Sequence, residues 1–292
     1  MTPENTPDNM SAKTLFLSDL DGTLLKSDLT LSRHTCDVLA AFTRAGHHFS
    51  YATARSIETA SRVTVGLNVG IPVIVHNGAF IVDSATRRPL WSAQFSDREK
   101  ADVFAAFRRR GLFPLVYSVI DGRNRFSYLR SACSRAQWAF VLSRSGHADD
   151  RRAREIFSPE QALEGTVYYF TCIGDTEEAL REVRSELEER YFTIFSRDIY
   201  TGAPWLEVLP KGTSKATAAK KLMTLLGCDR LICFGDEVND LPMFEIADER
   251  YAVGNAAPEL KKLATAVIGA NDDDAVARWL EAHFQSLFAK QA

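Results

Sequence analysis

The sequence predicts an α/β protein in which a parallel-sheet core is interrupted by an inserted α/β domain. Short apolar runs alternate with helical patterns over residues 14–87, and again over 205–292. Between these segments, over about 88–204, the runs become richer in aromatic and β-branched residues and are joined by turns. Strands that alternate with helices are typical of βαβ units and a parallel sheet. The two outer segments therefore predict one Rossmann-like core, and the middle segment predicts a separate domain.

In the first core segment, a helical pattern follows each of the first two strands. Apolar residues between positions 38 and 45 recur at helical spacing, and Gly46 follows them as a helix-ending residue. Strands are predicted at 15–17, 49–52 and 72–75, and helices at 29–45 and 57–65.

In the inserted segment, a turn at Asp121 and Gly122 separates two strand patterns, and the polar stretch 143–154 predicts a loop or a short helix. Helices are predicted at 97–110 and 175–189, and strands at 113–119, 125–129, 166–173, 191–195 and 205–208. The core alternation then returns. It predicts helices at 214–226, 241–247 and 258–264, and extended segments at 230–234, 252–253 and 266–268. A last helix, which Asp273 or Asp274 can cap, is predicted to run through Trp279 to Phe288.

Composition excludes several classes of protein. With 35 basic and 38 acidic side chains, the formal net charge is −3, so we expect no nucleic-acid partner. No apolar run approaches the roughly 18 residues of a membrane span. Residues 1–13 are polar and predict a disordered leader rather than a signal peptide. The five cysteines form no CxxC pair and predict reduced thiols. We expect a cytoplasmic monomer with no membrane partner.

The first candidate site is the segment 19–23, with Asp19, Asp21, Gly22 and Thr23 directly after an apolar strand. Ligands gather at the carboxyl ends of parallel strands, and a turn at Gly22 lets both carboxylates serve one site. Taken alone, this pattern also fits an Asx turn that binds no ligand.

Two further segments lie at starts of predicted helices. Thr53, Ala54 and Arg55 follow the second strand, where a hydroxyl and backbone N–H groups can hold phosphate oxygens. Lys211 and Lys215 flank a loop-to-helix junction, where a lysine can neutralise a phosphoryl group. Each segment alone is equally consistent with an ordinary helix cap or a solvent-exposed lysine.

The fourth segment, 235–240, follows an apolar strand and contains Asp236, Asn239 and Asp240. Carboxylate and amide oxygens at this spacing suit Mg²⁺, which prefers one or two carboxylates, waters and substrate phosphate. An acidic turn that caps the next helix is the simpler alternative.

The order of these four segments resembles that of the haloacid dehalogenase-like superfamily, in particular its Cof-like phosphatases with a large α/β cap. The matching motifs read DLDGTLL, a threonine in ATAR, a lysine in KGTSK, and GDEVND. Asn77-Gly78-Ala79 and Gly254-Asn255-Ala256 resemble the family's NGA and GNA segments, so the resemblance spans about 15–280. Ala54 departs from the family, which has glycine there.

The resemblance implies Mg²⁺-dependent hydrolysis of phosphomonoesters through an aspartyl-phosphate. Asp19 would be the nucleophile and Asp21 the general acid and base. Magnesium would be held by Asp19, the backbone carbonyl of Asp21, and Asp236. Phosphate would contact Leu20, Thr53, Ala54, Lys215 and Asn239, with Asp240, Asn77 and Lys211 in support. The family favours Lys215 as the catalytic lysine, with Lys211 as the alternative.

The inserted domain corresponds to the family's cap, and the resemblance implies that it helps to select the substrate. Candidate substrate contacts are Arg123, Arg125, Tyr200 and Trp205. We expect a small phosphorylated metabolite, with sugar phosphates as the first class and nucleotide-like, flavin or pyridoxal phosphates as others. Three alternatives are a phosphomutase or phosphotransferase on the same scaffold, a glycosyltransferase that binds metal through DxD, and a catalytically idle binding protein.

Overall fold

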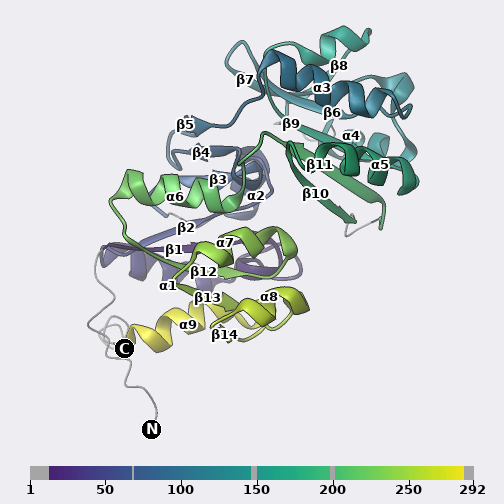
Figure 1. Ribbon diagram of the computed structural model, residues 1–292. Coiled ribbons are helices and arrows are strands. Elements are labelled where there is room, and N and C mark those ends of the chain that lie inside the picture. The colour runs from purple at the N-terminus through teal and green to yellow at the C-terminus, as the bar shows by residue number, and fades with distance from the viewer. Residues whose placement is uncertain (1–12, 68, 146–149, 198–200, 286–292) are drawn as a thin grey trace. The chain divides into compact units, whose positions relative to one another are not determined.

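The structure is a computed structural model that describes residues 13–67, 69–145, 150–197 and 201–285. The chain divides into two units, and each has its own sheet and core (Figure 1). Unit 1 comprises Met1–Trp91 and Ser214–Ala292, and unit 2 comprises Ser92–Thr213. The sequence had placed the inserted domain at 88–204. Unit 2 begins slightly later, at Ser92, and ends later, at Thr213, because strand β11 (Pro204–Leu209) pairs on both sides with strands of unit 2.

Unit 1 is built on a five-stranded sheet with the order β14-β13-β12-β1-β2, and every neighbouring pair in it is parallel. All five residues of β1 are buried. A parallel bridge between Ala52 and Ile74 brings β3 alongside the end of β2. The strands are β1 (Thr14–Ser18), β2 (His48–Tyr51), β12 (Arg230–Gly235), β13 (Glu249–Ala252) and β14 (Ala266–Val267), with a second sheet of β3 (Val73–Val75), β4 (Phe80–Val82) and β5 (Pro89–Ser92).

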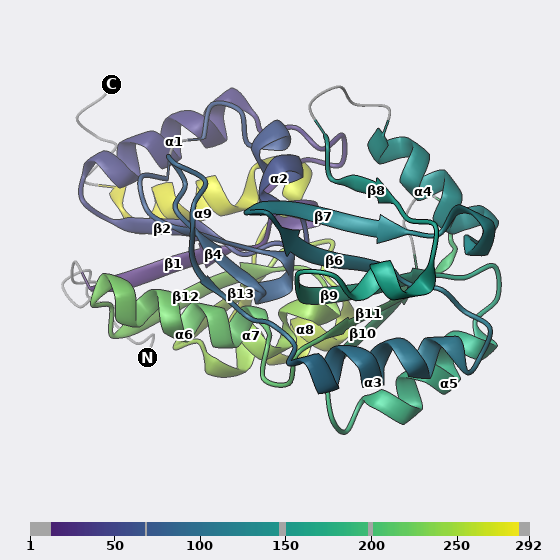
Figure 2. The same cartoon turned by 90° about the horizontal axis from the view of Figure 1, so that it is seen from above.

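Helices cover both faces of this sheet (Figure 2). Side chains alternate along β1, because successive residues of a strand point to opposite faces. Phe16 packs against Phe42 of α1 and Trp279 of α9, whereas Leu15 and Leu17 belong to the core shared with α6, α7 and α8. The helices are α1 (Arg33–Arg44), α2 (Ile57–Val63), α6 (Lys215–Leu226), α7 (Leu241–Ile246), α8 (Pro258–Leu263) and α9 (Ala275–His283). The predicted α/β class with a parallel core sheet is confirmed.

Unit 2 has a six-stranded sheet with the order β10-β11-β9-β6-β7-β8, which is antiparallel except for the pair β7 and β8. Phe107 of α3 and Val183 of α5 join Val116 and Phe170 of the sheet in one apolar core. The elements are α3 (Asp97–Arg108), β6 (Leu115–Ile120), β7 (Arg123–Tyr128), α4 (Arg135–Ser145), β8 (Ala153–Glu155), β9 (Thr166–Ile173), α5 (Glu178–Leu187), β10 (Phe192–Arg197) and β11.

Among the α-helices and strands of the described residues, four were not predicted from the sequence. Helix α4 was missed because Trp138, Phe140, Val141 and Leu142 surround its axis instead of forming one apolar stripe. Strands β4, β5 and β8 are short, with three or four residues each.

Two expectations from composition can be compared with the structure. All five cysteines are free thiols. None of the helices among the described residues combines the length and apolar character that a bilayer crossing requires.

Candidate active site

Lys215 and two aspartates form a buried ionic cluster at the carboxyl ends of β1 and β12. Asp19 follows β1, and Lys215 is the first residue of α6, whose N-terminus is capped by Ser214. The Lys215 Nζ atom lies 2.6 Å from Asp19 Oδ1 and 2.7 Å from Asp240 Oδ1. Asp19, Lys215 and Asp240 are 5%, 1% and 0% exposed. Because an ammonium group has three N–H donors, one remains available for a ligand.

Asp236 completes a group of three carboxylates with Asp19 and Asp240. One oxygen from each lies within 4.8 Å of the others. Thr23 donates from Oγ1 to Asp236 Oδ1 at 3.0 Å, which ties the turn after β1 to the end of β12. Gly22 permits this approach, because a Cβ atom there would lie 2.2 Å from Asp236 Oδ2 and its φ is +73°.

The charges of this cluster perturb its titration. Burial raises the pKa of Asp19 and of Asp236, and repulsion from neighbouring carboxylates adds to the effect. Burial by itself lowers the pKa of Lys215, but Asp19 and Asp240 reverse this and raise it above the usual range. These interactions favour the charged form of the lysine. Within the described part of the chain, the cluster has three carboxylates but only this one cation, so its negative charge is not fully compensated.

Asp21, two residues beyond Asp19, has a different environment. Its carboxylate forms a two-point ion pair with Arg55, whose Nε donates to Oδ2 at 2.7 Å while Nη2 donates to Oδ1. Among the described residues, the Asp21 side chain is not part of the three-carboxylate group. The two acids of the first motif thus have separate partners, one a lysine and the other an arginine.

Thr53 and Ala54 form the loop between β2 and α2. Thr53 is fully buried, and its Oγ1 accepts a hydrogen bond from the backbone N–H of Arg55 at 3.1 Å. A hydroxyl that accepts in this way can still donate its own hydrogen to a ligand. Ala54 is exposed and does not have a positive φ, so alanine fits this backbone without strain in place of the family's glycine.

Asn77 and Asn239 are brought together from distant parts of the chain. Asn239 Nδ2 donates to Asn77 Oδ1 at 3.2 Å. Asn239 follows β12 in the 3₁₀ turn Val238–Asp240, and Asn77 lies in the turn His76–Gly78 after β3. The Asn239 Oδ1 atom is buried and has no hydrogen-bond partner in the described part of the chain.

Of the other predicted residues, Leu20 is buried directly after Asp19, whereas Lys211 belongs to unit 2 and donates to the Glu189 carbonyl at 3.4 Å. Within unit 1, the structure places Lys215 next to Asp19. In unit 2, Trp205 packs edge-on against Phe140 and donates to Glu207 at 3.1 Å. Arg123 is exposed, Arg125 donates to the Arg151 carbonyl, and Tyr200 lies outside the described residues.

Three residues with clear contacts were given no role from the sequence. They are Thr23, Arg55 and Asn255, whose Nδ2 donates to the Gly22 carbonyl at 2.8 Å. Each lies inside a motif that was recognised, namely DLDGT, ATAR and GNA. Their place in those motifs was the available signal, but their partners could not be read from it.

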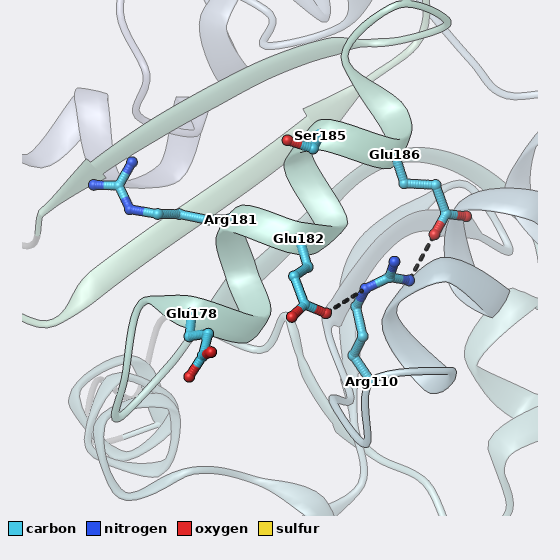
Figure 3. A pocket seen from close by; sticks show the side chains of 6 residues that line it. All are labelled: Arg110, Glu178, Arg181, Glu182, Ser185 and Glu186. Atoms are coloured by element: carbon cyan, nitrogen blue, oxygen red, sulfur yellow. Dashed lines mark hydrogen bonds and ion pairs between the residues drawn. The ribbon is translucent and has the colours of Figure 1, made fainter.

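Unit 2 also has a surface hollow between the end of α3 and α5 (Figure 3). Arg110 pairs there with Glu182 at 3.2 Å and with Glu186 at 2.6 Å. Arg181 pairs with Glu177 at 2.7 Å. This pattern is typical of a solvated helix surface, and we do not assign the hollow a catalytic role.

Comparison with known proteins agrees with this geometry. Residues 16–280 match the family model of haloacid dehalogenase-like hydrolases. A 5-amino-6-(5-phospho-D-ribitylamino)uracil phosphatase of Bacillus subtilis, YitU, is 26% identical over 278 residues, covering 92% of this chain and 97% of its own. A pyridoxal phosphate phosphatase of Escherichia coli, YbhA, is 23% identical over 273 residues, covering 91% and 96%.

A solved structure has the same fold. A haloacid dehalogenase-like hydrolase from B. subtilis superposes with a TM-score of 0.74 at 23% identity, covering 91% of this chain and 98% of its own. The family model covers most of the chain and spans all four motifs. The chain therefore belongs to the haloacid dehalogenase-like hydrolase family, as its motifs predicted, and it is a phosphatase of that family.

Proposed function

We propose that this phosphatase is a Mg²⁺-dependent phosphomonoester hydrolase that works through an aspartyl-phosphate on Asp19. The observation that carries the proposal is the pairing of Lys215 Nζ with Asp19 Oδ1 at 2.6 Å in a buried site. A buried carboxylate beside an ammonium group is poised to attack a phosphoryl group whose negative charge the same ammonium can stabilise.

The side chains present fit a divalent cation. Three buried carboxylates face one ammonium, and burial together with mutual repulsion raises the pKa of Asp236. Carboxylate oxygens whose negative charge is not fully compensated by nearby cations are suitable ligands for Mg²⁺. Asp19, Asp236 and the backbone carbonyl of Asp21 would hold the ion, and Asp240 would keep Lys215 in place. When bound, the ion supplies charge neutralisation between the nucleophile and the phosphoryl group.

The proposed reaction has two steps. An Asp19 oxygen attacks phosphorus while the ester P–O bond breaks, and Asp21 gives a proton to the leaving oxygen. Asp21 then takes a proton from water, which attacks the phosphorus and releases phosphate with the Asp19 carboxylate restored. Lys215, Thr53 and Asn239, with the backbone around Leu20 and Ala54, would hold the phosphoryl oxygens throughout.

Unit 2 is proposed to act as the substrate-selecting cap. Its insertion point supports this, because the chain returns to unit 1 at Ser214, directly before Lys215. Cap contacts would therefore be connected through a short segment to the phosphate site. Arg123, Arg125 and Trp205 remain the residues proposed for this role.

For the substrate, we propose a small metabolite with a phosphate on a sugar or sugar-alcohol carbon. The name of the YitU relative describes such a phosphoribityl ester, and the name of the YbhA relative extends the range to pyridoxal phosphate. The panel should therefore contain hexose, pentose and alditol phosphates, flavin mononucleotide and pyridoxal phosphate.

The test is the release of inorganic phosphate by the purified protein with Mg²⁺ across this panel. Asp19→Asn should abolish release, and Asp229→Asn, which changes an exposed acid next to β12, should not. Turnover without an acceptor would exclude an obligate phosphotransferase. If no phosphomonoester is cleaved, the proposal fails and an idle binding protein becomes the better reading.

A further inference from the structure

The turn His76–Gly78 after β3 has an unusual backbone. His76 and Asn77 both have φ of 51°, and Gly78 has φ of 94°. Left-handed backbone costs free energy for residues other than glycine, and it persists where surrounding contacts determine it. This run of left-handed residues lies at the carboxyl end of β3, where the sheet edge carries the candidate active site.

Hydrogen bonds attach this turn to the Thr53 loop. The backbone N–H of His76 donates to the Arg55 carbonyl at 2.9 Å, and that of Asn77 donates to the Thr53 carbonyl at 3.0 Å. The two carbonyls belong to the loop that carries the Thr53 hydroxyl and the Arg55 guanidinium. The turn therefore fixes the main chain from which both side chains project.

Gly78 brings the same turn against the start of α6. A Cβ atom on Gly78 would lie 2.2 Å from the Ser214 carbonyl oxygen and 3.0 Å from the Lys215 nitrogen. Only glycine allows the two main chains to approach so closely at this φ. The position of Lys215 is thereby coupled to that of the turn.

The Asn77 side chain extends this set of contacts to Asn239. Asn77 is 2% exposed, and its Oδ1 accepts from Asn239 Nδ2 at 3.2 Å. This bond leaves Asn239 Oδ1 directed elsewhere, and that atom is buried without a partner in the described residues. Nδ2 carries a second N–H that can donate to a phosphoryl oxygen, whereas the unsatisfied Oδ1 is an acceptor that suits a hydrogen-bond donor or a cation.

We propose that Asn77 is a positioning residue whose side chain orients the Asn239 amide, within a turn that contacts three phosphate-side elements. Those elements are the Thr53 loop, the start of α6 with Lys215, and the turn with Asn239. This inference rests on the proposed phosphatase function and adds to it a residue that acts through another residue. Asparagine suits the position because it tolerates left-handed backbone and offers a neutral acceptor.

The test uses Asn77→Gly, which keeps the backbone conformation accessible while removing the side chain, in the full-length protein. The matched control is Arg87→Gly, a second left-handed position (φ 59°) that is exposed in the loop between β4 and β5. Asn77→Gly should lower kcat/KM by about 10- to 100-fold, as for other residues that orient a site group. Both variants should retain cooperative thermal unfolding.

A double-mutant cycle with Asn239→Ala separates positioning from general damage. If Asn77 acts through Asn239, Asn77→Gly costs much less activity in the Asn239→Ala background than in the wild type. Additive losses, or an unchanged kcat/KM in Asn77→Gly, would overturn the inference. An inactive wild type would instead count against the proposed function, so the two failures are distinguishable.

Discussion

Arg55 and Asp21 form a two-point ion pair, in which Nε lies 2.7 Å from one carboxylate oxygen and Nη2 lies 2.5 Å from the other. Thirty-four positions separate them in the sequence, and the pair joins the first motif to the second. The fork of a guanidinium matches a carboxylate in plane and spacing, so it fixes the orientation of the acid as well as its charge. This pair holds the proposed proton donor in one direction.

Replacing Arg55 should therefore impair proton transfer selectively. Arg55→Ala is expected to lower kcat/KM by roughly tenfold or more for alkyl phosphates, whose leaving oxygens need a proton. For an aryl phosphate with an acidic leaving group, the decrease in kcat/KM should be much smaller. Arg55→Lys keeps the charge but loses the two-point geometry, so its kcat/KM for alkyl phosphates should lie between those of the wild type and Arg55→Ala. Equal losses on both substrate types would contradict this role.

Lys215 should be required for stability as well as for activity. Lys215→Ala leaves Asp19 and Asp240 buried without their counter-charge, and removal of one partner from a buried pair costs about 3–5 kcal/mol. The measurement is urea unfolding of the metal-free protein, followed by assay with Mg²⁺. Lys211→Ala is the control, because its exposed side chain should change unfolding free energy by less than about 0.5 kcal/mol. Similar losses in both variants would refute the difference.

Chelation should remove activity, and added Mg²⁺ should restore it. Mg²⁺ binds the folded state and raises its melting temperature by mass action, which a thermal scan with and without EDTA measures. Asp236→Ala removes one of the three clustered carboxylates and should abolish both the thermal shift and turnover. Asp229→Ala removes an exposed acid from the residue just before β12 and should preserve both. A full Mg²⁺ response in Asp236→Ala would exclude Asp236 as a ligand.

The Asn255 side chain should stabilise the turn that follows Asp19. Its amide donates to the Gly22 carbonyl at 2.8 Å and accepts from the Asn271 N–H at 3.1 Å. Asn255→Asp keeps the acceptor but loses the donor, and a bond of this kind contributes about 1 kcal/mol, or roughly fivefold in kcat/KM. Because Asn255 is exposed, the melting temperature should fall by only a few degrees. A large thermal loss with unchanged kcat/KM would place its role in the fold instead.

Much of the site could be predicted from the sequence because its parts are local. Asp19 and Asp236 each follow a continuous apolar strand, and parallel strands end at one edge of their sheet. Strand order then brings the two acids close, since β1 and β12 pair directly. Elements that were not predicted, such as α4 and β8, have a weak or very short hydrophobic pattern. They are stabilised by contacts that form only in the folded unit.

The sequence by itself determined which residue types stand at the sheet edge, and so the family and the candidate nucleophile. Tertiary structure decided the pairing: Lys215 with Asp19, Arg55 with Asp21, Asn77 with Asn239, and Asn255 with Gly22 across 233 positions. The physical reason is that periodicity reports which face of a strand or helix is buried. It does not report which distant donor meets a given acceptor, because that depends on strand order and on the close approach that glycines such as Gly22 and Gly78 permit.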